Sequence, residues 1–536
     1  MIEVSSLAYN RHPMSVYPSQ FNLCDYFLGD ERLRQIGDRT AIEYRDRRIT
    51  YNELRDEVDH WASRILSCGL NEGDRVALLL YDSPEFIACF LAAVSVGAVC
   101  VPINTFLPAR DVEFILADSA ARLLVVESEL EDKVNSSGET ENRCAVLKVD
   151  TRTRSCSKPD DINPRTEPLA HAATTRETPG FLLYTSGSTG TPKGVLHLHG
   201  SIPFTVENYA ANVLRLNSED RVFSASRMFF AYGLGNSLSF PLAAGATVLL
   251  ESERMSAERL AGFIEERAPT VFFGVPAVYL TLLDYRLSGK RVDLSSVRLC
   301  ISAGEALPAK IFEDWQQEFE LTILDGIGST EMLHIFISNR EGNSLVGSSG
   351  TVVEGYDARL VDDAGHAVGA KELGNLWVRG GSATAEYWNR PELTEQTIKD
   401  GWVHTGDVYR RDDDDFFYHI GRSDDCFKVR GLWVSPIEVE SVLISHEAVS
   451  EAAVVSSVDD SGLATARAYV VIREGERGEA LKDEIRSFAG SRLPQYKVPS
   501  QIEFIEEMPR TSTGKIQRYK LRAESGRLLS GGSDDQ

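Results

Sequence analysis

The stretch YTSGSTGTPKG, residues 184–194, combines three glycines, five Ser or Thr hydroxyls and one lysine. Glycine lets backbone N–H groups turn to one side and approach a ligand closely. The hydroxyls add donors, and Lys193 adds a mobile positive charge. These residue types predict a loop, neither helix nor strand, that binds phosphate. It is not a Walker loop, which ends in Gly-Lys-Ser/Thr, because Gly190 is followed by Thr-Pro-Lys-Gly.

The sequence on either side argues against a flexible linker, the usual alternative for a Gly/Ser/Thr run. FLLY directly before the loop has the pattern of a buried strand, and GVLHLHGSI directly after it resumes an apolar pattern. The loop is therefore expected to connect two parts of a folded core.

The elements around this loop have an α/β rhythm. From Arg75, short aliphatic runs alternate with segments of helical pattern, and the same alternation occurs again between residues 245 and 307. Aliphatic runs without polar residues at every second position are typical of parallel strands that are covered on both faces. The apolar run 86–101 is too short for a membrane span and predicts a buried helix running into a strand. We expect an α/β body to about residue 420, with an exposed loop over 132–180.

The last hundred or so residues are expected to fold separately as a small α+β domain, with a helix over SPIEVESVLISH. At 536 residues the chain should hold two or more domains.

The net charge of the chain, -24, argues against nucleic acid as a partner. Eight scattered cysteines without paired spacing and the absence of a secretory signal predict a cytoplasmic protein with reduced thiols and no membrane association.

Six stretches in chain order resemble the adenylate-forming superfamily, which includes acyl- and aryl-CoA ligases, firefly luciferase and peptide synthetase adenylation domains. They are YTSGSTGTPKG, SAGEAL (302–307), DGIGSTE (325–331), HTGD (404–407), GRSDD (421–425) and PRTSTGKIQR (509–518). The segments RMFFAYGLGNSLSFPLAAGATVLL and DGIGSTEMLHIFISNR resemble the benzoate-CoA ligase branch. The resemblance implies a large N-terminal adenylate-forming domain with mixed α/β sheets over 1–423. It also implies a small mobile C-terminal α+β domain over 424–536, hinged at Asp424.

The resemblance implies that ATP, Mg²⁺ and coenzyme A take part. Forming an acyl-adenylate brings anions together, so catalysis should rest on positioning and electrostatic stabilisation. Glu331 is expected to hold Mg²⁺, with a helix cap as the alternative. Asp407 is expected to accept from the ribose hydroxyls, with a turn-stabilising role as the alternative. The full set expected around the nucleotide is Thr185, Ser186, Gly187, Ser188, Thr189, Gly190, Lys193, Gly304, Glu305, Asp325, Gly326, Ile327, Ser329, Thr330, Glu331, Asp407 and Arg422.

Lys515 in TSTGKIQ is the principal catalytic candidate, because its counterpart in the family reaches from the small domain to the carboxylate and the α-phosphate. A surface lysine is the alternative. Residues 510–527 contain six Lys or Arg and one Glu, so this patch could also meet the phosphates of CoA.

The resemblance places five residues around the acid: Ala231, Tyr232, Gly328, His334 and Ile335. A free α-amino acid is disfavoured, because the segment carries no Asp to pair with a buried ammonium. His334 is either a packed wall residue or a contact to the carboxylate or to a ring substituent. Benzoate, anthranilate and hydroxybenzoates all remain open. The stretch EYWN, residues 386–389, departs from the family pattern and is expected to affect a turn.

These residues predict an ATP-dependent aryl-CoA ligase that forms an aryl-AMP intermediate. The alternative within the superfamily loads the aryl group onto the phosphopantetheine of an acyl-carrier protein. A catalytically silent binder of nucleotide or aromatic acid is a third alternative, which the presence of Lys193, Glu331, Asp407 and Lys515 disfavours. A homodimer is compatible with the sequence.

Overall fold

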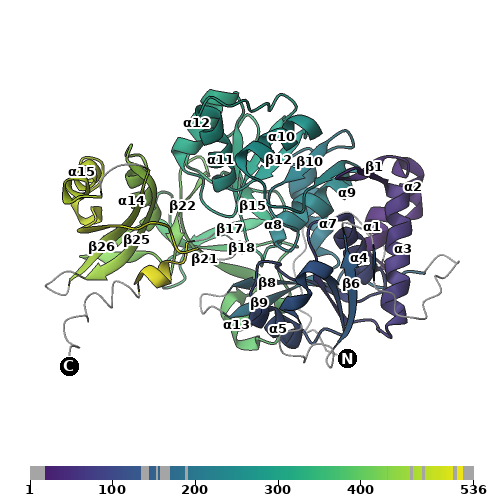
Figure 1. The fold of residues 1–536 in the computed structure, drawn as a ribbon. Coiled ribbons are helices and arrows are strands. Elements are labelled where there is room, and N and C mark those ends of the chain that lie inside the picture. The colour runs from purple at the N-terminus through teal and green to yellow at the C-terminus, as the bar shows by residue number, and fades with distance from the viewer. Residues whose placement is uncertain are drawn as a thin grey trace, which may run out of the picture.

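The computed structural model describes residues 19–134, 144–151, 155–156, 170–186, 191–430, 432–458, 463–473, 477–510 and 516–522. A large N-terminal part holds three sheets, and a smaller C-terminal part lies to one side of it (Figure 1). No helix among the described residues is long and apolar enough to cross a membrane.

An eight-stranded sheet carries the glycine-rich stretch. Its order is β19-β9-β8-β4-β3-β5-β6-β7, and β8, β4, β3, β5 and β6 run parallel. The strands are β3 (Arg75–Leu79), β4 (Val99–Pro102), β5 (Leu123–Glu127), β6 (Ala145–Asp150), β7 (Ser155–Cys156), β8 (Pro179–Ser186), β9 (Pro192–Leu198) and β19 (Glu386–Tyr387). The chain between β3 and β6 also forms the helices α4 (Pro84–Ser95) and α5 (Ala109–Asp118) and the 3₁₀ helix η1 (Ser128–Lys133).

The expected buried helix running into a strand is confirmed. Every residue of α4 is buried, and so is every residue of β4. The Ser83 hydroxyl caps α4 by accepting from the N–H of Phe86, and Pro84 occupies the first turn, where its missing N–H costs nothing.

The expectation of a continuous loop over 132–180 is wrong in part. Ala145–Asp150 forms β6, which pairs in parallel with β5, and β7 extends the edge of the sheet. Buried Leu147 and Val149 alternate with the less buried Lys148 and Asp150, as in a strand covered on one face, and the polar residues around this stretch mask so short a signal.

A nine-stranded sheet forms the second layer, in the order β16-β15-β14-β13-β12-β10-β11-β1-β2. The parallel pairs from β1 through β14 confirm the α/β rhythm predicted around residues 245–307. The strands are β1 (Thr40–Tyr44), β2 (Arg47–Thr50), β10 (Arg221–Ser224), β11 (Thr247–Leu250), β12 (Val271–Gly274), β13 (Leu299–Ser302), β14 (Ile323–Gly328), β15 (Ile335–Ser338) and β16 (Thr351–Val352). Its helices include α3 (Tyr51–Ser67), α9 (Phe240–Ala244), α10 (Ala257–Arg267), α11 (Pro276–Leu287) and α12 (Ala309–Phe319).

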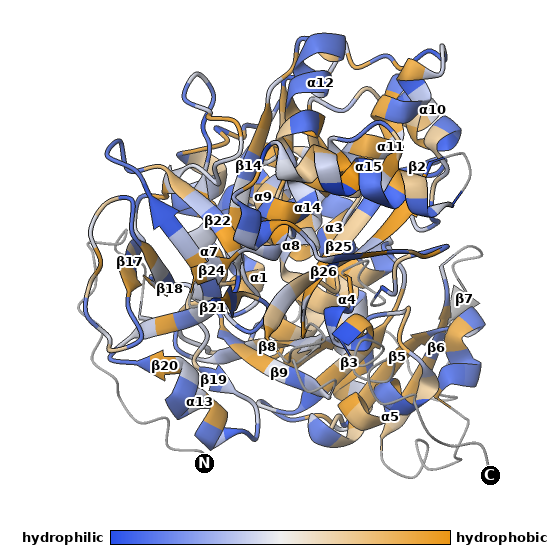
Figure 2. Cartoon of the chain, turned by 90° about the vertical axis from the view of Figure 1, so that its left-hand side faces the viewer, coloured by the Kyte–Doolittle hydropathy of each residue, from blue (hydrophilic) through white to orange (hydrophobic). Residues whose placement is uncertain are grey.

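One hydrophobic cluster joins the two large sheets. It contains Ile42 of β1, Val76 of β3, Phe90 of α4 and Phe273 of β12, all buried completely. The strands of this interior are orange in Figure 2, whereas the outer helices α12 and α13 (Pro391–Thr397) are largely blue. The two sheets therefore form a single core, against which the segments of the site are fixed.

A third, antiparallel sheet leads to the C-terminal part. It contains β17 (Asp357–Val361), β18 (Leu373–Arg379), β20 (Ile398–Lys399), β21 (Trp402–Arg411) and β22 (Phe417–Arg422). The hairpin β23 (Phe427–Val429) and β24 (Leu432–Val434) follows.

The C-terminal part is the small α+β unit expected from the sequence. It consists of α14 (Pro436–Ile444), β25 (Val449–Val458), β26 (Ala464–Ile472), α15 (Glu479–Gly490), the 3₁₀ turn η4 (Gln495–Lys497) and β27 (Gln501–Phe504). It has hydrophobic clusters of its own, which begin at Val429, whereas the large core ends at Phe417. The domain boundary at 423/424 falls between these residues and stays a prediction.

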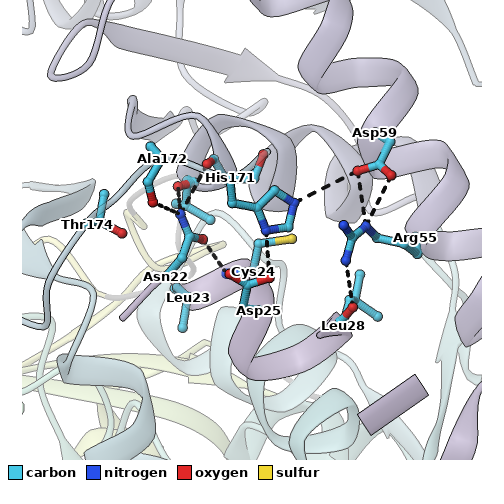
Figure 3. A network of polar contacts seen from close by, with 12 residues as sticks. Asn22, Leu23, Cys24, Asp25, Leu28, Arg55, Asp59, His171, Ala172 and Thr174 are labelled. Atoms are coloured by element: carbon cyan, nitrogen blue, oxygen red, sulfur yellow. Dashed lines mark hydrogen bonds and ion pairs between the residues drawn. The ribbon is translucent and has the colours of Figure 1, made fainter. Parts of the chain in front are cut away.

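A polar network fixes the segment that enters β8 (Figure 3). The side chain of His171 is almost fully buried, and its Nδ1 lies 2.7 Å from Oδ1 of Asp25 in α1 (Leu23–Leu28). Its Nε2 lies 3.9 Å from Asp59 in α3, which also pairs with Arg55. Asn22 donates to the Ala172 carbonyl oxygen. These contacts hold the chain just ahead of the strand that ends in the glycine-rich stretch.

Candidate active site

Lys193, Glu331 and Tyr387 form a triangle where β9, the turn after β14 and β19 meet. Lys193 Nζ lies 3.3 Å from Glu331 Oε1 and 3.0 Å from the Tyr387 hydroxyl oxygen, and the hydroxyl donates to Glu331 Oε1 at 2.6 Å. The Lys193 ammonium also lies 4.2 Å from the centre of the Tyr387 ring. Antiparallel pairing of β19 with β9 places Tyr387 opposite Val195 and so next to Lys193.

The electrostatics of the triangle keep Glu331 charged. Burial favours its protonated form, but the Lys193 charge and the Tyr387 hydrogen bond outweigh burial and lower the pKa of Glu331. Burial and the Glu331 charge raise the pKa of Tyr387, so its hydroxyl stays a donor. An ionised carboxylate of this kind fits Mg²⁺, a hard cation that is commonly held by one or two carboxylates together with substrate phosphates. No cluster of three or more His, Cys, Asp or Glu ligands occurs among the described residues.

The turn that carries Glu331 is fixed through its backbone. His197 Nε2 lies 2.8 Å from the Thr330 carbonyl oxygen, and the Thr384 N–H donates to the Glu331 carbonyl oxygen at 2.6 Å. Burial lowers the pKa of His197 to about 4, so the ring is neutral and can donate through Nε2. The Ser329 hydroxyl accepts from the Met332 N–H within the turn. The backbone of 329–331 is therefore set by the surrounding strands.

A second charged group forms in the middle of β21, where Asp407 pairs with Arg422 of β22. The carboxylate of Asp407 is mostly buried, and its Oδ1 lies 3.4 Å from Arg422 Nη1 and 3.5 Å from His419 Nε2. Burial opposes its ionisation, but these partners lower the pKa of Asp407 overall. Arg422 also donates to the Thr405 carbonyl oxygen at 2.8 Å. An anionic acceptor with a cation beside it can receive sugar hydroxyls while meeting a phosphate.

Further residues expected around the nucleotide lie just after β13 and within β14. Gly304 lies just after β13 with φ of +94°, a conformation that favours glycine, and the adjacent Glu305 is exposed. Burial raises the pKa of the Asp325 carboxyl, while its carbonyl oxygen accepts two bonds from Asn339. The Asp325 backbone therefore ties the middle of β14 to the residue that follows β15, and Gly326 and Ile327 continue the strand.

The five residues predicted around the acid gather where the helical segment 231–239 faces β14 and β15. The rings of Tyr232 and His334 have centroids 5.4 Å apart, and the Tyr232 hydroxyl donates to the Ile301 carbonyl oxygen. A Cβ at Gly328 would lie 2.6 Å from the His334 carbonyl oxygen, so only glycine allows this approach. Ala231 and Ile335 are buried beside them.

His334 is neutral and oriented by a residue that the sequence analysis did not single out. Burial lowers the pKa of His334 to about 3. Its Nε2 lies 3.1 Å from Oδ1 of Asn236, which can only accept, so Nε2 carries the proton and Nδ1 is an acceptor. The amide of Asn236 is oriented in turn by the Ser224 hydroxyl at 3.4 Å. The group around His334 thus offers polar atoms but no charge.

Comparison with known proteins assigns the chain to a family. The AMP-binding enzyme family profile matches residues 29–388, and the AMP-binding enzyme C-terminal domain profile matches residues 438–515. A benzoate-CoA ligase of Thauera aromatica is 40% identical, with 96% of this chain and 98% of the relative covered. A 4-hydroxybenzoate-CoA/benzoate-CoA ligase of Rhodopseudomonas palustris is 36% identical, with 95% and 94% covered. The crystal structure of an anthranilate CoA ligase in complex with anthranoyl-AMP superposes with a TM-score of 0.89 at 37% identity, covering 96% and 99%.

The chain belongs to the AMP-binding enzyme family. Within it the chain lies on the benzoate-CoA ligase branch of the adenylate-forming superfamily, as the sequence motifs indicated. The predicted fold class, a large α/β part followed by a smaller C-terminal domain, is confirmed by the family match and by the architecture.

Five of the predicted site residues lie outside the described residues. They are Gly187, Ser188, Thr189 and Gly190 of the glycine-rich stretch and Lys515 near the C-terminus. The ends of the glycine-rich stretch are described, and they correct one expectation: Thr185 and Ser186 end β8 and pair with Lys193 and Pro192 of β9, so these four residues belong to strands and not to a loop. The hairpin keeps Lys193 on a strand, which fixes its backbone.

Sequence reasoning missed Tyr387 and Asn236. Tyr387 lies in EYWN, which was noted only as a departure from the family pattern. The tyrosine hydroxyl in this segment was the feature that could have indicated a hydrogen-bonding role. Asn236 is a buried amide inside the apolar segment 228–242, and a polar residue in such a segment needs a partner. Its partner, His334, is almost a hundred residues away in sequence.

Proposed function

We propose that this protein joins an aromatic carboxylic acid to coenzyme A in two half-reactions. ATP and the acid give aryl-AMP and pyrophosphate, and the thiol of CoA then displaces AMP to give the thioester. The supporting observation is that a single turn after β14 carries both Glu331, which is ionised beside Lys193, and His334, which lies in an uncharged aromatic group. Only two residues thus lie between Glu331, the group suited to phosphate and metal, and His334, which lies among the side chains suited to a ring.

In the first half-reaction the chain acts by placing charge. Lys193 would meet the pyrophosphate that leaves, and Asp407 would accept from the ribose hydroxyls with Arg422 beside it. Glu331 would hold Mg²⁺, which when bound supplies charge neutralisation between phosphate oxygens. Lys515 would reach the carboxylate and the α-phosphate from the C-terminal domain. Each of these roles is a proposal for this chain.

The acid is proposed to be benzoate, anthranilate or a hydroxybenzoate. The five residues gathered around Tyr232 and His334 include no charged side chain, so a second ionised group on the substrate would be left without a partner among them. The Thauera aromatica relative is a benzoate-CoA ligase, and the superposed crystal structure holds anthranoyl-AMP. Benzoate and anthranilate each carry a single carboxylate on one benzene ring.

The test is a panel of substituted benzoates incubated with the full chain, ATP, Mg²⁺ and CoA, with products identified by mass. Aryl-CoA and AMP are expected for benzoate and for at least one amino- or hydroxybenzoate. Aryl-AMP that accumulates without aryl-CoA, but is consumed when a phosphopantetheinyl carrier protein is added, would instead assign the carrier-loading reaction. Absence of aryl-AMP with every acid would contradict the proposal.

A further inference from the structure

Two peptide planes near the predicted hinge are held by opposite parts of the molecule. The first plane joins residues 422 and 423. The N–H of Ser423 donates to the Gly406 carbonyl oxygen at 2.9 Å, and Arg422 donates to the Thr405 carbonyl oxygen at 2.8 Å. Gly406 and Thr405 lie in β21, so this plane moves with the large part.

The second plane joins residues 424 and 425 and is held from the other side. Arg522 Nη1 donates to the Asp424 carbonyl oxygen at 2.9 Å, and its Nη2 lies 2.5 Å from Asp425 Oδ1. One guanidinium therefore contacts the peptide plane and the side chain that follows it. Figure 1 shows the yellow segment 516–522 at the junction between the two parts of the chain.

Arg518 fixes the same segment to the body of the C-terminal part. Its guanidinium lies 2.8 Å from Oε2 of Glu440 in α14, and Glu440 also accepts from the Val454 N–H of β25. Arg518 additionally lies 3.7 Å from the second oxygen of Asp425. The side chains of Glu440 and Asp425 are mostly buried, so these ion pairs are less screened by solvent than surface pairs. The plane after Asp424 is thereby tied to α14 and β25.

We propose that Arg522, together with Asp425, confines the rotation between the two parts to the backbone of Ser423 and Asp424, which makes Arg522 a positioning residue for both half-reactions. Peptide planes are rigid, so only the φ and ψ angles of these two residues lie between the fixed planes. This inference rests on the proposed function, because it assumes that the same C-terminal part must serve adenylation and then thiol attack.

The observed orientation includes contacts that a rotation must break. The N–H groups of Asp425 and Cys426 both donate to the Arg422 carbonyl oxygen, at 3.1 and 2.9 Å, and close a turn across the two planes. The Arg522 contacts lie entirely on the C-terminal side and can persist in either orientation. Without them the freely rotating segment would extend beyond Asp424, and the C-terminal part would sample more orientations.

The experiment compares the wild type with Arg522→Gln and Asp425→Asn in the two half-reactions, measured separately by single turnover. Unproductive orientations lower the occupancy of each productive one, so we expect both rates to fall by about fivefold in each variant. The KM values for ATP and the acid should stay within about twofold, because these ligands bind the large part. Arg522→Lys should recover part of the loss, since an ammonium can meet one of the two acceptors.

Arg486→Gln is the matched control. Arg486 makes an exposed pair with Asp483 on α15, in the same part of the chain but away from residues 516–522 in sequence. It contacts neither of the two peptide planes, so its replacement should leave both rates unchanged.

A direct readout is single-molecule energy transfer between two dyes, one on each part of the chain. Glu266 on α10 and Glu479 on α15 are both exposed and suit attachment after replacement by cysteine. The distance distribution should broaden in Arg522→Gln and stay as in the wild type for Arg486→Gln.

Unchanged rates together with an unchanged distance distribution in Arg522→Gln would overturn the inference. Slower rates with raised KM values and an unbroadened distribution would also overturn it, because Arg522 would then act on substrate binding. Failure of the proposed function is distinguishable, since the wild-type chain would then form neither aryl-AMP nor thioester, whereas the energy-transfer measurement would still report the rotation.

Discussion

Tyr387 shows how one hydroxyl can set the charge of a site. It donates to Glu331 Oε1 at 2.6 Å while its ring lies against the Lys193 ammonium, so it contacts both members of the ion pair. A carboxylate that is buried needs such partners to stay ionised. Because Tyr387 remains a neutral donor, it stabilises the negative charge without cancelling it.

We expect Tyr387→Phe to lower the rate of aryl-AMP formation by about tenfold and to raise the Mg²⁺ concentration needed for half-maximal rate, because the Glu331 carboxylate loses a donor. The measurement is pyrophosphate release at varied Mg²⁺. Tyr418→Phe is the control, since the Tyr418 hydroxyl of β22 donates to Asp412 in the turn before that strand and should not affect the rate. An unaltered Mg²⁺ dependence in Tyr387→Phe would contradict the role.

His334→Leu is expected to lower kcat/KM for amino- and hydroxybenzoates by about tenfold more than for benzoate, because the Nδ1 acceptor is lost. Asn236→Ala should act in the same direction, since it removes the partner that keeps the proton on Nε2. Equal losses for benzoate and for the substituted acids would show that His334 only packs. The measurement is pyrophosphate release with each acid.

Lys515→Ala is expected to leave the chain folded and to lower aryl-AMP formation by about a hundredfold or more, since a charge that stabilises the transition state is removed. Pyrophosphate release measures the step, and circular dichroism checks the fold. Lys520→Ala, a lysine five residues further along, is the control. Retention of full adenylation by Lys515→Ala would refute its central role.

At the scale of elements, sequence reasoning located the strands and helices whose pattern is local. The apolar run 86–101 was predicted as a helix followed by a strand because a buried helix needs no polar face. β6 was missed because six residues between polar segments carry little signal, and its place is decided by pairing with β5. Tyr387 was missed for a similar reason, since only the pairing of β19 with β9 brings it to Lys193.

The contacts of His171, in the segment that enters β8, should make the stability of the fold depend on pH. Burial opposes protonation, but the hydrogen-bonded carboxylate of Asp25 and the nearby carboxylate of Asp59 raise the pKa of His171 above its ordinary 6.5, despite the opposing charge of Arg55. The protonated form is thus favoured by folding. Its stabilisation is complete below pH 6.5 and is lost as the pH rises through the raised value of the folded state.

We therefore expect His171→Asn to lower the free energy of unfolding by about 1 kcal/mol more at pH 6 than at pH 9. Urea unfolding at the two pH values measures the difference. His366→Asn is the control, because the side chain of His366 is exposed beside Asp362. A loss that is the same at both pH values would show that packing, and not charge, is what His171 contributes.

At the scale of the whole molecule, the proposed reaction needs one C-terminal part to serve two steps. Asp424→Pro should spare aryl-AMP formation within about threefold and slow thioester formation by about a hundredfold, because proline fixes φ at the pivot. The two half-reactions are measured separately. Asp424→Ala keeps the backbone free and should leave both rates near the wild-type values, whereas equal slowing of both steps by proline would argue against a pivot at this residue.

The separate hydrophobic clusters of the two parts also bear on how the molecule responds to heat. The large core ends at Phe417 and the C-terminal clusters begin at Val429, so no buried apolar cluster among the described residues spans both parts. Single domains usually melt in one two-state transition, whereas chains with several domains commonly depart from it. Calorimetry should therefore resolve two endotherms, and saturating ATP should shift the larger one upward by mass action while moving the smaller one less.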